Sequence, residues 1–185
     1  MANKGTGAGG ANTNANGLPF EEVSQVSNSD EYNIQAEHTY YKVVDFGRNV
    51  KFITGKKNKF HTNMSRISTS DFNGKERLHG LKEPDQWFIR EDTRDVYIIE
   101  SKFQQGGGSV CEKLQTAFIK KRRLQRNYGD LVIHYMYALS PWWRDNCPAE
   151  IEELQLDKFP IFWGDSPTIR DEIIDFIHSD EVVQH

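Results

Sequence analysis

Long apolar runs are missing from this chain, and so are the cysteine and histidine patterns that mark several classes of protein. No stretch reaches about 18 consecutive apolar residues and the N-terminus has no apolar signal-peptide core, so neither a membrane span nor secretion is expected. The two cysteines, Cys111 and Cys147, are too few for a disulfide framework, and they form no CxxC pair. The six histidines show no HxxH or HxxxH spacing. A reducing cytoplasm is therefore the default location, without a membrane partner.

The first residues of the chain are dominated by Gly, Ala, Asn and Thr. Gly5, Gly7 and Gly10 match GxGxxG, but no strand precedes them, so a dinucleotide site is rejected. We expect residues 1–16 to be a flexible or extended segment. With 37% hydrophobic and 12% aromatic residues, 17–185 is long enough to bury a core and is expected to form a single domain.

Charge is distributed unevenly along the chain, although the formal net charge is only −4. Residues 42–82 carry ten Lys or Arg and three Asp or Glu, and residues 101–144 carry eight and two, giving +7 and +6. Residues 145–185 are −9, and residues 1–41 and 83–100 are −4 each. The two basic segments flank an acidic one, as a phosphate-binding surface around a metal site requires, although charge runs are also common on solvated faces.

The pattern of apolar and turn-forming residues predicts an α/β fold with a mixed central β-sheet flanked by helices. A capping box at Ser109–Glu112 marks the start of a helix that is expected to run to about residue 127. Residues 60–82 are ambiguous, 141–143 are expected to form a loop, and the functional site is expected at one edge of the sheet. Helices are predicted over 17–27, 109–127 and 169–177, and strands over 40–46, 50–54, 86–90, 95–102, 131–139 and 159–163.

The most informative spacing is Asp85 followed by Glu100-Ser101-Lys102. Side chains alternate along a strand, so Glu100 and Lys102 point to the same face. If the hairpin is symmetrical about Asp92 and Thr93, then Asp85 faces Glu100 with Cβ atoms about 5 Å apart. Two carboxylates in this arrangement suit Mg²⁺, which prefers hard oxygen ligands, and Lys102 is placed to hold or deprotonate a water.

A solvated sheet edge that ends in Glu-x-Lys is the alternative interpretation of this spacing. The continuous apolar run over residues 96–99 argues against it, because such runs are typical of central strands. A carboxylate and an ammonium at the end of a buried strand need partners or a function.

With Pro84-Asp85, Glu100-Ser101-Lys102 and the following helix and strand through Leu139, the chain resembles the PD-(D/E)XK nuclease superfamily. Within it, the chain is similar to small Type II restriction endonucleases. The stretch IIESKFQQGGGSVCEKLQT and the N-terminal GGANTNANGLPFE also look like forms seen in such enzymes, and together these segments cover about two thirds of the chain. The resemblance implies a restriction-endonuclease-like core.

The resemblance also implies roles for individual residues. Asp85 and Glu100 would bind Mg²⁺, with Mn²⁺ as a substitute, and Lys102 would position and activate the attacking water. The Ser101 carbonyl and Glu21 would complete the metal site, although Glu21 equally suits the first turn of a helix as a dipole-stabilising residue. The expected products carry a 5′-phosphate and a 3′-hydroxyl.

The expected substrate is double-stranded DNA, cut at a short specific site by a homodimer, with a cognate methyltransferase encoded nearby. Two alternatives stay open: a junction-resolving, repair or mobile-element nuclease of the same fold, and an inactive DNA-binding module. The candidate DNA contacts are Lys56, Lys57, Gln104, Gln105, Lys113, Gln115, Lys120, Lys121, Arg122, Arg123 and Arg126.

Overall fold

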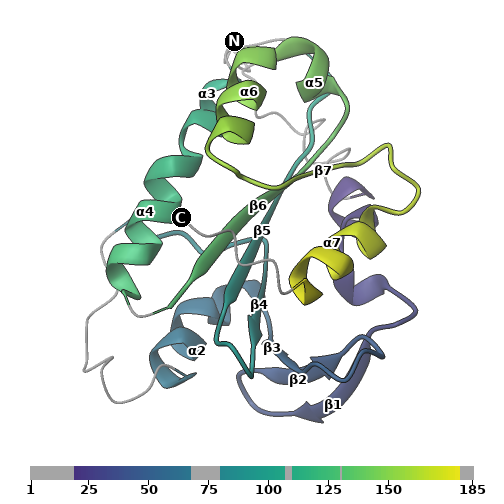
Figure 1. The fold of residues 1–185 in the computed structure, drawn as a ribbon, viewed down its shortest axis with the longest axis vertical. Helices are drawn as coiled ribbons and strands as arrows, with labels where there is room; N and C mark the ends of the chain where they lie inside the picture. Colours follow the sequence, from purple (N-terminus) through teal and green to yellow (C-terminus); the bar gives the residue numbers. More distant parts are fainter. Residues whose placement is uncertain (1–18, 68–79, 107–109, 130, 180–185) are drawn as a thin grey trace, which may run out of the picture.

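The computed structural model describes residues 19–67, 80–106, 110–129 and 131–179. The expected extended segment 1–16 and the Ser109 cap therefore lie outside the described residues. The fold is α/β, built on one seven-stranded mixed sheet in the order β1 to β7 (Figure 1). Strands β1 to β5 are antiparallel neighbours, and β5, β6 and β7 are parallel. The strands are β1 (Asn33–Glu37), β2 (Lys42–Asp45), β3 (Phe52–Thr54), β4 (Gln86–Arg90), β5 (Val96–Lys102), β6 (Ile133–Leu139) and β7 (Ile161–Trp163).

Helices cover both faces of this sheet (Figure 1). One face packs against α2, α3, α4, α5 and α6, and the other against α7 and the segment after a short helix at residues 19–23. Within the described ranges, no helix combines the length and the apolar character needed to cross a membrane. The helices are η1 (Val26–Asn28), η2 (Lys57–Lys59), α2 (Phe60–Ile67), α3 (Glu112–Gln115), α4 (Ala117–Asn127), α5 (Trp142–Asn146), α6 (Pro148–Leu156) and α7 (Ile169–His178).

The side chains of β5 divide the core into two clusters. Ile98 packs into the cluster on the α4 side of the sheet, and Ile99 packs into the cluster on the α7 side. Because side chains alternate along a strand, Glu100 and Lys102 continue the Ile98 face and Ser101 continues the Ile99 face. Glu100 and Lys102 therefore lie on the face of the sheet that α4 covers.

The β4–β5 hairpin has the register that the sequence predicts. Gln86 pairs with Ile99 and Ile89 pairs with Val96, which is symmetrical about Asp92 and Thr93. The turn closes through Arg94, whose left-handed backbone has φ 64°. The predicted position of the site at one edge of the sheet is wrong, because β5 is paired with β4 on one side and with β6 on the other.

Several other elements differ from the sequence expectations. The helix expected over 109–127 is divided at Thr116 into α3 and α4, and the one expected over 17–27 ends at residue 23 before η1. Strand β1 and helices α2 and α6 were not predicted. The expected loop at 141–143 enters α5, because Trp143 is fully buried and its indole N–H donates to the Lys102 carbonyl at 3.0 Å.

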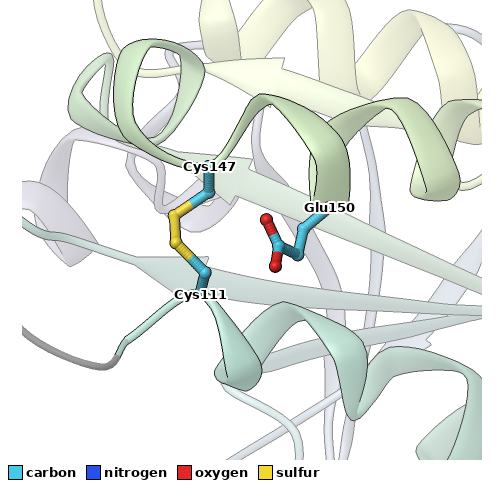
Figure 2. A group of neighbouring side chains, drawn as sticks. All are labelled: Cys111, Cys147 and Glu150. Carbon is cyan, nitrogen blue, oxygen red and sulfur yellow. A yellow bond between two sulfur atoms is a disulfide. The ribbon is translucent and has the colours of Figure 1, made fainter.

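The two cysteines are paired, which the sequence analysis did not predict. Cys111 stands just before α3 and Cys147 lies between α5 and α6, with Cα atoms 5.6 Å apart (Figure 2). The Glu150 carboxylate lies beside the bridge (Figure 2), with one of its oxygen atoms within 4.8 Å of both sulfur atoms. Because the sulfur atoms are bonded to each other, this group acts as a covalent joint between helices.

Candidate active site

Three oxygen atoms surround the Lys102 ammonium at the end of β5. Its Nζ atom lies 2.7 Å from Glu100 Oε2, 3.1 Å from Asp85 Oδ2 and 3.2 Å from the Ser101 carbonyl oxygen. The Ser101 backbone N–H also donates to Asp85 Oδ2 at 3.1 Å. The predicted triplet is thus brought together, with both carboxylates and one carbonyl directed at a single point.

The hairpin and its surroundings hold these carboxylates largely away from water. The side chains of Asp85 and Glu100 are 13% and 9% exposed, and that of Lys102 is 23% exposed. The Lys102 carbonyl accepts hydrogen bonds from the Trp143 indole and from the Ser140 backbone N–H, at 3.0 and 3.1 Å. Helix α5 therefore anchors the backbone that carries the site.

Two further lysines reach the carboxylates from other elements. Lys57, on η2, contacts Asp85 Oδ1, so each oxygen of that carboxylate faces an ammonium. Lys120, on α4, places Nζ 3.6 Å from Glu100 Oε2. Two carboxylates are thus matched by three lysines, and the cluster carries one surplus positive charge.

Burial and the neighbouring opposite charges shift the pKa values of these side chains in opposite directions. Burial favours the neutral form of Asp85, but Lys102 and Lys57 outweigh it and hold the pKa of Asp85 below its ordinary value. Burial likewise disfavours the charge on Lys102, yet Glu100 and Asp85 raise its pKa. Burial, with the charge of Lys102 added to it, lowers the pKa of Lys120 despite Glu100 nearby.

The carboxylates open on a cavity of about 750 Å³ between α4 and residues 80–85. Tyr135, on β6, also lines the cavity, and its hydroxyl is buried. Burial and then the charge of Glu100 raise the pKa of Tyr135, so its hydroxyl is a donor. The cations in the cavity lining are Lys57, Lys82, Lys102, Lys113, Lys120 and Arg123.

Of the predicted DNA contacts, Lys57, Lys113, Lys120 and Arg123 line the cavity. Others have structural partners instead. Gln104 is buried and its side chain donates to the Gly106 carbonyl at 2.7 Å, and Gln115 donates to Glu150 at 3.1 Å. Lys121 lies over the Phe159 ring. The predicted contacts outside the cavity lining also include Lys56, Gln105, Arg122 and Arg126.

Glu21 also lies outside the cavity lining, with an exposed side chain. Ser24, at the end of the same helix, contacts the Ser101 hydroxyl at 2.9 Å. Since Ser101 and Glu100 point to opposite faces of β5, this contact places the helix against the face opposite the carboxylates. The predicted metal-binding role of Glu21 stays a prediction.

Among the cavity residues that sequence reasoning missed are Lys82 and Tyr135. Lys82 stands three residues before Asp85 within a basic segment, so proximity in sequence was an available signal. Tyr135 pairs with Ile98 across the parallel β5–β6 ladder. No local pattern shows that pairing, and Tyr135 therefore becomes a site residue only in the folded sheet.

The donor set fits a hard divalent cation. Two carboxylates and a backbone carbonyl already converge on a cationic group, and Mg²⁺ prefers such oxygen ligands while retaining several waters. The buried Tyr135 hydroxyl, which also lines the cavity, provides a hydrogen-bond donor beside them.

Comparison of the chain with protein-family models, with curated proteins and with solved structures gives no match.

Proposed function

We propose that this protein is a Mg²⁺-dependent nuclease that hydrolyses phosphodiester bonds of DNA. The observation that carries the proposal is the convergence of Asp85, Glu100 and the Ser101 carbonyl on the Lys102 ammonium, beside a cavity whose other charged groups are mainly cations. Carboxylates suit a metal, and the surrounding cations suit the phosphates of a polyanion.

In this proposal Asp85, Glu100 and the Ser101 carbonyl hold the metal ion. A divalent ion held there would supply Lewis acidity and would favour deprotonation of an attacking water. Lys102, on the same face of β5 as Glu100, would orient that water or a phosphate oxygen by donating hydrogen bonds from its ammonium group. Lys113 and Arg123, both in the cavity lining, neutralise neighbouring phosphates.

The finer assignment, a homodimeric Type II restriction endonuclease with a restriction-endonuclease-like core, rests on the resemblance of Pro84-Asp85 and Glu100-Ser101-Lys102. It includes cleavage of double-stranded DNA at a short specific site, with 5′-phosphate and 3′-hydroxyl products. A cytoplasmic location and a methyltransferase encoded nearby belong to the same proposal.

The direct test is incubation of the purified full chain with plasmid DNA in Mg²⁺, in Mn²⁺ and in EDTA. We expect discrete fragments with either metal and intact DNA in EDTA, with mapped ends giving the position of the cut. Intact DNA under every condition, from a protein whose circular dichroism shows it folded, would refute the nuclease proposal.

The choice of substrate separates the finer alternatives. Linear duplex, a four-way junction and a flapped duplex of the same sequence are offered in parallel with Mg²⁺. Preferential cleavage at a fixed duplex sequence supports the restriction endonuclease, and preferential cleavage of the branched forms contradicts it in favour of a junction-resolving or repair nuclease. Metal-dependent binding without any cleavage indicates the inactive DNA-binding module.

A further inference from the structure

Each carboxylate of the site is contacted by a second lysine in addition to Lys102. Lys57 occupies Asp85 Oδ1, and Lys120 lies 3.6 Å from Glu100 Oε2. These two lysines come from η2 and α4, which border the same cavity. A metal ion that binds Asp85 and Glu100 must therefore compete with lysines that belong to two separate elements.

We propose that Lys57 and Lys120 guard the metal site: they hold its carboxylates in the absence of nucleic acid and move to phosphate oxygens when substrate enters. This inference rests on the proposed nuclease function and adds to it a substrate-controlled metal affinity. The guards differ from Lys102, which lies on the same strand as Glu100 and has three oxygen partners in place.

The positions of the two guards allow such an exchange. The Lys57 side chain is 53% exposed and that of Lys120 is 29% exposed, so both ammonium groups can reach the open cavity. A lysine has a flexible four-carbon stem and binds as a point charge, so it can transfer between acceptors without movement of its backbone. Phosphate oxygens entering the cavity offer the guards a new anionic partner.

Charge balance makes the exchange depend on substrate. Two carboxylates and three lysines leave one surplus positive charge in the absence of metal. A divalent ion raises that surplus to three, and the repulsion opposes binding until phosphates enter. By linkage, if DNA strengthens metal binding, metal strengthens DNA binding by the same factor.

A purely structural role for these lysines predicts a different outcome. Ion pairs that only stabilise the fold would leave metal affinity unchanged or weaker when a lysine is removed, because the site would loosen. The guard role predicts tighter metal binding instead, a gain that a damaged fold does not produce.

The test measures Mn²⁺ binding to the full chain without DNA, by electron paramagnetic resonance. We expect Lys57→Met and Lys120→Met each to tighten Mn²⁺ binding by about two- to fivefold, corresponding to the loss of a partly exposed ion pair. Lys56→Met and Arg122→Met are the matched controls for metal affinity, because each removes one charge within two residues of a guard in the sequence but outside the cavity lining. In EDTA, affinity for a 20-base-pair duplex should fall in the guard variants.

Two results would overturn the guard role in distinguishable ways. If wild type binds Mn²⁺ and Asp85→Asn does not, but Lys57→Met and Lys120→Met bind no more tightly than their controls, only the guard role fails. If wild type and Asp85→Asn bind Mn²⁺ equally, or if wild type binds no Mn²⁺ even when the duplex is present, the metal site itself fails and the proposed function fails with it.

Discussion

Charged residues occur at both ends of the β4–β5 hairpin, but the two ends are built differently. At the turn, Arg90 Nε donates to Asp92 Oδ1 at 2.9 Å, and the Asp92 side chain is 56% exposed. At the open end, Asp85 and Glu100 are 13% and 9% exposed. The Asp92 carboxylate at the turn is exposed to water, whereas both carboxylates at the open end are largely buried.

The origin of the partners differs as well. Arg90 and Asp92 are two residues apart, so the turn can form this pair almost alone. The open end draws Lys57 from η2 and Lys120 from α4, and it borders the cavity. Buried carboxylates that are served by several distant cations cost desolvation energy that an apolar cluster would not, which points to a functional reason for their presence. Burial and convergence therefore distinguish a candidate site from an ordinary charged strand end.

The largest expected effect separates the two ends by activity. Asp85→Asn and Glu100→Gln should each reduce DNA cleavage by about 100-fold or more, because each removes a proposed ligand of the metal that stabilises the transition state. Asp92→Asn, at the turn, should leave cleavage unchanged. Initial rates on a supercoiled plasmid measure all three.

Thermal unfolding of the same variants controls for loss of fold. Cleavage retained by Asp85→Asn, or lost equally in Asp92→Asn, would remove the distinction between the two ends.

The disulfide offers a way to loosen the open end selectively. Reduction, or Cys111→Ser with Cys147→Ser, should lower the free energy of unfolding by about 3–4 kcal/mol in the chain-entropy view, since the bridge spans a separation of 36 residues. Because α5 ends at this bridge and anchors the Lys102 carbonyl, hydrogen exchange should increase more at residues 100–102 than at 90–95. Equal protection changes at both ends would contradict this coupling.

The pH dependence of stability should also differ between Asp85, at the open end of the hairpin, and Asp92, at the turn. The folded pKa of Asp85 lies below its unfolded value of about 4, so its ion pairs stabilise the fold above that pH. This contribution is lost as pH falls through the folded pKa. Asp85→Asn should therefore flatten the decline in unfolding free energy below about pH 4, measured by urea denaturation.

Asp92 provides the comparison for this pH effect. Its pKa is also lowered, with burial acting against the Arg90 hydrogen bond, but its side chain is exposed. Asp92→Asn should change the decline in unfolding free energy at acid pH less than Asp85→Asn does. The reverse ranking would show that the turn makes the larger electrostatic contribution to stability.

The smallest effect is expected at the turn itself. Asp92→Ala should change the free energy of unfolding by less than about 1 kcal/mol at neutral pH, because exposed ion pairs contribute little. Chemical denaturation measures this difference, and a substantially larger loss would show that the turn acts as more than a solvated closure.

Much of the site's framework followed from local patterns. The strand expected over 86–90 matches β4, and the symmetrical register about Asp92 and Thr93 is confirmed. A helix was expected over 109–127, and Leu114, Ala117 and Leu124 are buried on it, although the helix is interrupted at Thr116. These features depend on alternation, helical spacing and a short turn, which act over a few residues.

Longer-range contacts account for most of what sequence reasoning missed. Helix α5 forms where a loop was expected, because Trp143 is buried and bonded to the Lys102 carbonyl. The pairing of Cys111 with Cys147 depends on α3 and α6 lying side by side. Helix α6 carried a readable local signal, since Pro148 stands in its first turn.

The sequence by itself determined the strand pair, its register and therefore the meeting of Asp85 with Glu100, because each follows from the chain's immediate neighbourhood. Only the tertiary structure decided that Lys57, Lys120 and Tyr135 would join them around a cavity. Their elements meet through sheet pairing and helix packing between residues far apart in the chain, and no short spacing encodes those contacts. The acids of the proposed metal site therefore come from one hairpin, whereas Lys57 and Lys120 come from elements far apart in the chain.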